Sequence, residues 1–205
     1  MMFENYEKDY SKMGFKDIVG IDEVGRGTLF GDVVACAIIM PMDLRIEGIK
    51  DSKKLTEKKR EKLYEIILEE ALAVGVGRVD SDTIDKINIR MATHLAMSKA
   101  ISNLRDRNGD EVTPDILLID AEKIESEFTQ VSIVKGDDKC YSIACASIVA
   151  KVYRDRLCKL WAKEYPGYGL ERHKGYATKL HREAIKLYGP SDMHRKSFLK
   201  NIGDW

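Results

Sequence analysis

Apolar and polar positions alternate along the chain in two distinct periods. Runs rich in β-branched residues, typical of strands, predict five strands at 15–24, 31–40, 73–80, 115–120 and 131–138. Apolar residues at helical spacing predict helices over 51–72, 81–104, 142–164 and 178–188. The second of these helices has Ser81 or Asp82 as its expected cap. Strands first, then alternating helices and strands, then helices, predict a mixed sheet covered by helices.

The glycine-rich stretch 25–31 separates the first two strands and predicts a hairpin. Residues 31–40 are apolar throughout, as expected for a central strand buried on both faces. A chain of 205 residues without a Ser/Gly-rich linker predicts one α/β domain over 1–205. Its last part, about 142–205, is expected to form a helical extension.

The composition is that of an ordinary globular protein, with 44% hydrophobic and 33% charged residues. No apolar run approaches the roughly 18 residues that span a bilayer, and the polar N-terminus does not resemble a signal peptide. The four cysteines lack CxxC spacing, which favours reduced, buried thiols over a disulfide or zinc site. A cytoplasmic protein without membrane partners is expected.

The formal net charge of zero hides an uneven distribution. Residues 1–138 hold 20 Lys and Arg against 28 Asp and Glu, whereas residues 139–205 hold 14 against 6. A basic C-terminal third suits a polyanion such as a phosphate backbone, but it also fits a set of solvated helix faces.

Acidic residues follow three of the predicted strands, at Asp22/Glu23, Asp120 and Asp137/Asp138. If the strands are neighbours, these carboxylates converge, and each raises the pKa of the others. A divalent cation removes that penalty, and oxygen ligands favour Mg²⁺ or Mn²⁺ over zinc. Each acid alone is more often an ordinary strand-end or cap residue, but the three positions together favour the metal site.

Adjacent residues on a regular strand point to opposite faces, so Asp22 and Glu23 need a break in the strand to face one ion. Gly25 and Gly27 make such a break plausible. Beside a basic groove, paired divalent ions would support phosphodiester hydrolysis.

Five longer motifs follow one another from about Val19 to Phe198: GIDEVGRGTLFGDVVACAII, DSKKL, LLIDA, KGDDKCYSIACASIVAKVYRD and YPGYGLERHKGYATKLHREAIKLYGPSDMHRKSF. In this order they resemble the type 2 ribonucleases H (ribonuclease HII). The resemblance implies a ribonuclease H-like fold with a helical C-terminal extension. It also implies an endoribonuclease that cuts the RNA strand of RNA–DNA hybrids, and cuts 5′ to ribonucleotides embedded in duplex DNA, as in primer removal and ribonucleotide excision repair.

The same resemblance implies roles for individual residues. The metal-binding and catalytic carboxylates, holding Mn²⁺ or Mg²⁺ in a two-metal mechanism, would be Asp22, Glu23, Asp120 and Asp137. Gly25, Arg26 and Gly27 would read the 2′-hydroxyl at an RNA–DNA junction, and Tyr176 would stack on the neighbouring sugar. Products would carry 3′-hydroxyl and 5′-phosphate ends, and a monomer is expected.

The chain departs from the family pattern at three positions. Thr28 and Asp32 stand where prolines are usual, which could alter the stiffness of the turn between the first two strands. Ala121 stands where a glycine often follows the third acid.

Other residues are assigned less directly. Lys53, Lys54, His173 and Lys174 are expected to contact the nucleic-acid backbone. Asn88 and Arg90 suit either a substrate contact or a helix face, and Lys151, Arg154 and Arg156 either a groove or solvent. We expect His94 to be a packed histidine, and His194, Arg195 and Phe198 to anchor the C-terminal helices.

Two alternative functions remain. A type 3 ribonuclease H would cut hybrids without junction preference, but that family usually lacks an arginine at position 26 and carries an additional N-terminal domain. A non-catalytic hybrid-binding protein would not need all four acids.

Overall fold

The computed structural model describes residues 3–49 and 55–200. A six-stranded sheet forms the centre, in the order β4-β3-β2-β1-β5-β6. The strands are β1 (Ile18–Val24), β2 (Val33–Ile39), β3 (Ala73–Val79), β4 (Arg105–Asp106), β5 (Ile116–Asp120) and β6 (Thr129–Ile133). β1 to β4 pair antiparallel, and β5 pairs parallel with both β1 and β6. The predicted hairpin and mixed sheet are confirmed.

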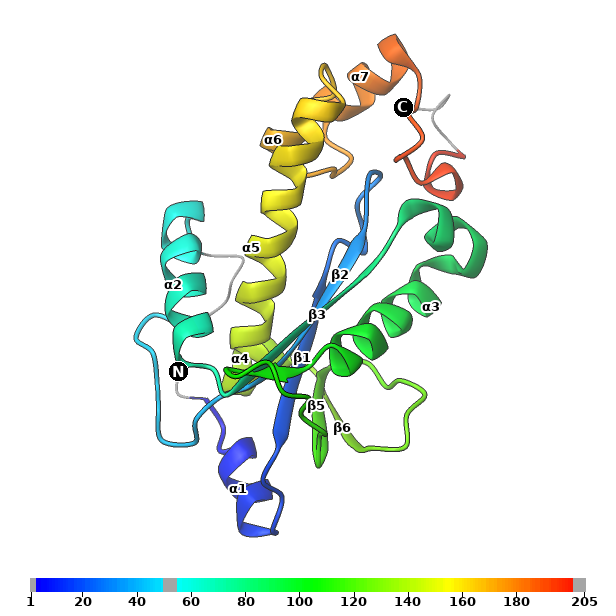
Figure 1. Ribbon diagram of the computed structural model, residues 1–205. Coiled ribbons are helices and arrows are strands. Elements are labelled where there is room, and N and C mark those ends of the chain that lie inside the picture. The colour runs from blue at the N-terminus through cyan, green and yellow to red at the C-terminus, as the bar shows by residue number, and fades with distance from the viewer. Residues whose placement is uncertain (1–2, 50–54, 201–205) are drawn as a thin grey trace.

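Helices cover both faces of this sheet (Figure 1). They are α1 (Tyr6–Lys12), α2 (Glu57–Glu70), α3 (Ser81–Ser102), α4 (Gly136–Lys139), α5 (Tyr141–Glu164), α6 (Leu170–His173) and α7 (Lys179–Tyr188), with a 3₁₀ turn at Lys196–Phe198. α3 packs on one face of the sheet, and α5 with α2 on the other. The alternating side chains of β1 and β2 therefore enter two separate apolar cores.

Two details of the predicted elements are wrong. The cap of α3 is Asp80, one residue earlier than expected, because its side chain accepts a hydrogen bond from the Thr83 N–H at 2.8 Å. The strand expected over 131–138 ends at Ile133, because Lys135 adopts a left-handed conformation (φ 57°) and α4 follows at once. Asp137 consequently lies on a helical turn instead of a strand end.

α5 makes unusually close contact with the centre of the sheet. Gly20 of β1 lies so near the start of α5 that an added Cβ would come within 2.4 Å of the Ser142 carbonyl carbon. Because both partners are backbone, no side-chain rotation could relieve such a clash. Gly20 thus sets the distance between β1 and α5.

The second half of α5 carries the helical extension away from the sheet (Figure 1). There Trp161 and Cys158 join a small core with residues of α6, α7 and the turn between β1 and β2, notably Phe30. The predicted anchors are confirmed: His194 packs edge-on against Phe30, and Arg195 donates to the Gly31 carbonyl oxygen at 2.9 Å.

All four cysteines are buried free thiols, as predicted. No helix in the described ranges is both long and apolar enough to cross a bilayer.

We expect Gly20→Ala to lower the free energy of unfolding by about 1–3 kcal/mol, because the new methyl group forces β1 and α5 apart. Gly27→Ala is the matched control, since a Cβ at Gly27 would have no atom within 4 Å. Urea unfolding measured by circular dichroism tests the pair. Equal stability of the two variants would contradict the role given to Gly20.

Candidate active site

The strand pairing around β1 opens a gap at its C-terminal end. β1 remains paired with β2 as far as Val24, opposite Val34, but its pairing with β5 ends at Ile21, opposite Ile119. The expected break between Asp22 and Glu23 is therefore not present on the β2 side. Instead, the two carboxylates border the opening between the ends of two parallel strands.

Asp22 points to the α5 face and is only 6% exposed. Its Oδ1 accepts from the Glu23 N–H at 2.7 Å, and its carboxylate also bonds to the Ser147 hydroxyl of α5. Burial raises the pKa of Asp22 well above its usual range, and the charges of Glu23 and Asp120 raise it further. Asp22 is thus a carboxyl group whose ionised form lacks sufficient compensation in the protein alone.

Asp120 reaches the same region from β5, and its contact with Gly136 brings the start of α4 near it. Asp120 Oδ1 accepts from the Gly136 N–H at 2.6 Å, which fixes the start of α4. Asp137 is the next residue and is 9% exposed. A side chain at Gly136 would come within 2.7 Å of Ile143 and 3.2 Å of Asp120 Oδ1. Because Gly136 has no side chain, the backbone that leads into Asp137 can lie close to Asp120.

Glu23 points to the opposite face from Asp22, toward α3. Its Oε1 accepts from Arg26 at 3.2 Å, while its Oε2 is buried without a hydrogen-bond partner. Burial raises the pKa of Glu23, and the nearby Arg26 charge opposes that shift. The negative charge of Asp120 raises the pKa of Glu23 as well, so the two carboxylates influence each other.

Glu122 is a fifth carboxylate beside this group, and no sequence pattern singles it out. It accepts from Arg26 at 2.7 Å and lies 3.0 Å from Nε2 of His94. Burial opposes ionisation of Glu122, but the His94 and Arg26 hydrogen bonds outweigh it and lower its pKa. The left-handed Ala121 (φ 48°) precedes it, and no sequence period signals such a reversal.

His94 is consequently not the apolar-packed histidine expected from its helix. It is half-buried and points to Glu122, as does Arg90 one turn earlier, at 3.8 Å. Asn88 interrupts α3 with φ 66°, and its side chain accepts from the N–H groups of Arg90 and Met91. The Asn88 side chain therefore caps the part of α3 that resumes after the kink, and this part carries Arg90 and His94 toward Glu122.

The turn after Glu23 meets the segment around Tyr176. Thr28 forms an isolated antiparallel bridge with Tyr176, and the Leu29 N–H donates to the Gly175 carbonyl oxygen at 2.8 Å. Gly27 is exposed at the tip of the turn, and Tyr176 is 42% exposed. Two segments separated by almost 150 residues therefore form one surface next to the acids.

Four basic residues are expected to contact nucleic acid, and the structure describes two of them, His173 and Lys174. Lys53 and Lys54 lie outside the described residues. His173 is buried, with Nε2 2.7 Å from the Tyr168 carbonyl oxygen and its ring stacked on His181. Lys174 is 9% exposed and donates to the Glu171 carbonyl oxygen. These contacts give His173 and Lys174 structural roles within the fold.

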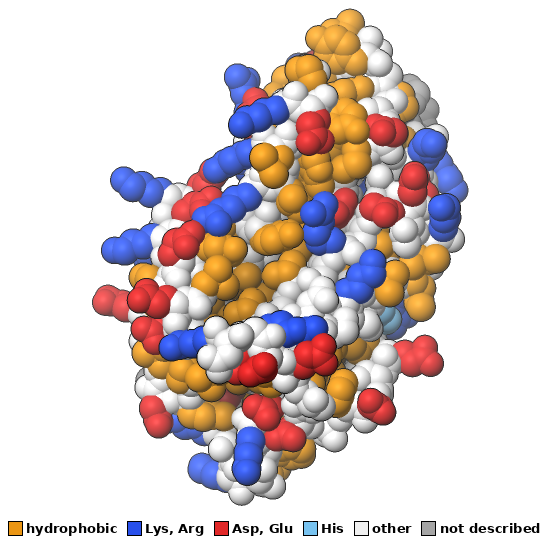
Figure 2. All heavy atoms as spheres, in the orientation of Figure 1, with side chains coloured by type: hydrophobic (Ala, Val, Ile, Leu, Met, Phe, Trp, Pro, Cys, Tyr) orange, Lys and Arg blue, Asp and Glu red, His pale blue; other side chains and the backbone are white. Residues whose placement is uncertain are grey.

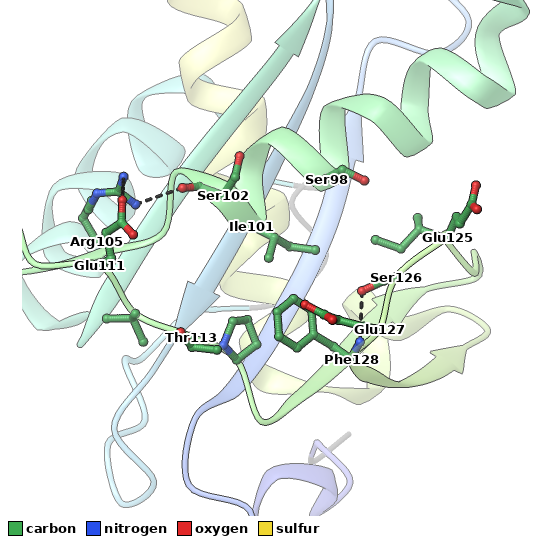
Figure 3. A pocket seen from close by; sticks show the side chains of 13 residues that line it. Ser98, Ile101, Ser102, Arg105, Glu111, Thr113, Glu125, Ser126, Glu127 and Phe128 are labelled. Atoms are coloured by element: carbon green, nitrogen blue, oxygen red, sulfur yellow. Dashed lines mark hydrogen bonds and ion pairs between the residues drawn. The ribbon is translucent and has the colours of Figure 1, made fainter.

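A hollow of about 590 Å³ lies away from these residues, between α3 and the loops that flank β5 (Figure 3). Ile101 and Phe128 contribute apolar surface to it, and Arg105 pairs with Glu111 at its edge. The acids of the strand ends do not line it.

Comparison with known proteins agrees with this arrangement. The family model described as Ribonuclease HII matches residues 19–201. A curated Ribonuclease HII from Alkaliphilus oremlandii is 61% identical over 189 residues, which is 92% of this chain and 93% of that protein. The chain belongs to the ribonuclease HII family. It is therefore a metal-dependent ribonuclease H, a hydrolase.

Solved ribonuclease H structures share the architecture. The ribonuclease H2 from Pyrococcus horikoshii is 25% identical, with a TM-score of 0.73 over 91% of this chain and 97% of that one. The structure of Bst-RNase HIII in complex with Mn²⁺ is 18% identical, with a TM-score of 0.62 over 88% of this chain and 64% of that one, and shares the fold. The expected ribonuclease H-like fold is confirmed.

The carboxylates of this ribonuclease HII family member suit a hard divalent cation. The donors are all oxygens, one of them is the unpartnered Glu23 Oε2, and the buried Asp22 lacks a cationic partner among the groups that shift its pKa. In the part of the chain that the structure describes, no three acidic, histidine or cysteine side chains already enclose a metal-sized space. Glu23 is held by Arg26 instead, so its side chain would have to turn in order to join a metal site.

Without added metal, Asp22→Asn should stabilise the protein at neutral pH. Below the ordinary aspartate pKa of about 4 the carboxyl is protonated in both states; above it, only the unfolded state ionises freely, so wild-type stability falls as pH rises toward the raised folded value. We expect a melting temperature about 2–4 °C higher for the variant at pH 7, and no difference at pH 3.

Thermal melts in EDTA across this pH range test the effect. Asp138→Asn is the control, because Asp138 is exposed. A variant that is less stable than wild type at pH 7 would show that the Asp22 charge is compensated in the fold.

Proposed function

We propose that this protein cuts the RNA strand of RNA–DNA hybrids and cuts duplex DNA 5′ to a single embedded ribonucleotide. The products would carry 3′-hydroxyl and 5′-phosphate ends. The observation that carries the proposal is the bridge between Thr28 and Tyr176 beside the carboxylates. It supports a surface where a sugar is examined and the adjacent phosphodiester is hydrolysed. Primer removal and ribonucleotide excision repair are the processes that such an activity would serve.

The turn Gly25–Gly27 suits recognition of a 2′-hydroxyl. A Cβ at Gly27 would face open space, so the backbone there is accessible to a sugar at close range. A 2′-hydroxyl can both donate and accept a hydrogen bond, which distinguishes RNA from DNA at one position. Tyr176, bridged to this turn and exposed, would stack on the next sugar, where a deoxyribose fits.

Asp22, Glu23, Asp120 and Asp137 would hold Mg²⁺ or Mn²⁺, as their oxygen donors favour. Divalent ions at this site would neutralise the phosphodiester and lower the pKa of a bound water. Glu23 would first leave Arg26, whose guanidinium keeps a second partner in Glu122. Arg26 would then remain in place beside the sugar, and water, not the 2′-hydroxyl, would be the nucleophile.

The C-terminal extension over about 142–205 is proposed to lie along the duplex. Its charge is less available than its composition indicates, because Arg154 and Arg195 are buried and Arg156 pairs with Glu61 and Glu65 of α2. Figure 2 shows Lys, Arg, Asp and Glu side chains intermixed along the α2 side of the molecule. A monomer acting on a nucleic-acid duplex is the proposed working form.

The first experiment compares two end-labelled duplexes, one with a single ribonucleotide in DNA and one an RNA–DNA hybrid. We expect cleavage 5′ to the lone ribonucleotide with Mg²⁺ or Mn²⁺, none in EDTA, and at least about a hundredfold less for Asp22→Asn, since loss even of outer-shell partners costs 10–100-fold. Cutting of the hybrid alone would favour a type 3-like activity. Binding of both duplexes without cleavage would refute the proposed cleavage activity.

Gly27→Ala tests the turn separately from stability. Because the added methyl meets no protein atom, the variant should fold as wild type yet hold the sugar away from the backbone. Cleavage at the single ribonucleotide should fall by about a hundredfold, the cost of a misplacement of about 1 Å. If the cleavage rate and the melting temperature are both unchanged, the 2′-hydroxyl is not recognised by the backbone at Gly27.

A further inference from the structure

The turn between β1 and β2 rests on one buried arginine of α5. Arg154 is fully buried, and its guanidinium donates to four oxygen acceptors and, at 3.6 Å, to the Cys158 sulfur. Nε donates to the Asp32 carbonyl oxygen at 2.8 Å, Nη1 to the Lys174 carbonyl oxygen at 2.8 Å, and Nη2 to the Phe30 carbonyl oxygen and the Thr28 hydroxyl, each at 2.9 Å. One rigid, planar group therefore holds both the turn and the segment that leads to Tyr176.

Thr28 continues this connection toward the acids. Its hydroxyl lies 3.1 Å from the Gly25 carbonyl oxygen and accepts from Arg154, so it links the start of the turn to the guanidinium. Its backbone forms the bridge with Tyr176. Thr28 is fully buried, so water does not replace either contact.

The glycines at both sides show how closely these parts fit. Gly25 has φ 92°, and a Cβ there would lie 2.3 Å from Arg154 Nε. Gly175 has φ 85°, and a Cβ there would lie 3.0 Å from the Phe30 carbonyl oxygen. The turn, the guanidinium and the Tyr176 segment are thus in direct contact, without space for independent movement.

Arg195 supports the same turn from the C-terminal end of the chain. It donates to the carbonyl oxygens of Arg26 and Gly31, each at 2.9 Å. With Arg154 it draws the carbonyl groups of residues 26, 30, 31 and 32 inward. Carbonyl groups fixed inward constrain which peptide groups at the tip can face a bound sugar.

We propose that Thr28 and Arg154 are positioning residues for junction specificity. They fix the Gly25–Gly27 turn, which is proposed to read the 2′-hydroxyl, at a set distance from Tyr176, which is proposed to contact the next sugar. The inference rests on the proposed junction activity. Neither side chain contacts the substrate itself, since both are fully buried.

This role differs from plain stabilisation in what it predicts. A residue that only stabilises the fold affects both substrates equally, because both use the same carboxylates. A residue that sets the distance between the turn and Tyr176 affects mainly the single-ribonucleotide duplex. There the one ribose must lie at the turn while the neighbouring deoxyribose lies at Tyr176. The long hybrid offers a ribose at every position and tolerates a shift of the turn.

Thr28→Val is the test variant, because it keeps the shape and removes the hydroxyl. Arg154 Nη2 retains the Phe30 carbonyl oxygen as a partner, so the variant leaves no unpaired buried charge. We expect kcat/KM for the single-ribonucleotide duplex to fall about tenfold, the rate equivalent of one buried hydrogen bond, and that for the hybrid to change less than about threefold. Thr28→Ser, which keeps the hydroxyl, should restore the preference.

Hydrogen exchange of the substrate-free protein gives a second readout. The Leu29 amide, bonded to the Gly175 carbonyl oxygen, should exchange faster in Thr28→Val, whereas amides in the centre of β1 should not. Arg156→Lys is the control on the same helix, because Arg156 points to α2 and not to the turn. It should change neither the exchange nor the preference.

The outcomes separate the two proposals. A wild-type protein without junction cleavage would refute the proposed function, and the positioning role with it. A wild type that prefers the junction, with a Thr28→Val variant that keeps the same preference or loses both activities equally, would refute the positioning role alone. Selective loss on the single ribonucleotide, together with faster Leu29 exchange, supports it.

Discussion

The close contact between Gly20 and the start of α5 determines the arrangement of everything around the site. Because no side chain separates them, the helix lies directly on β1. Ser147 then reaches Asp22, and Arg154, two turns and about 10 Å further along the same helix, lies under Gly25. One rigid helix therefore positions the carboxylates and the turn that follows them, and neither can shift without the other.

The site holds negative charges, on Asp22 and Glu23, that the protein alone does not fully compensate. Asp22 has a raised pKa, and Glu23 leaves one oxygen unpartnered while its other oxygen pairs with Arg26. Arg26 also pairs with Glu122, which His94 holds from α3. The arginine proposed to lie beside the sugar is thus a counter-ion of the acid cluster. Glu122, held by His94, would remain as the partner of Arg26 if Glu23 turned to a cation, as proposed.

The sequence predicted the parts of this site that depend on strand period. Asp22, Glu23 and Asp120 follow apolar runs, and parallel strand ends meet at one edge. The local structure predicted for Asp137 is wrong, because a left-handed Lys135 ends the strand early and Asp137 lies on α4. Glu122 and His94 could not be found from pattern, since their contact depends on how α3 crosses the sheet and on the reversal at Ala121.

Charge was the least reliable guide, and the reason is physical. The basic excess of residues 139–205 indicated a phosphate-binding surface, yet two of its arginines are buried under the turn between β1 and β2. A lysine or arginine on the surface can grip a phosphate, but it carries no information about the sugar. Recognition of one 2′-hydroxyl by backbone groups, as proposed for the Gly25–Gly27 turn, instead requires that this backbone does not move. Burying Arg154 and Arg195 against the carbonyl groups of the turn holds that backbone in place. Part of the charge that composition assigns to affinity would then serve the proposed selectivity.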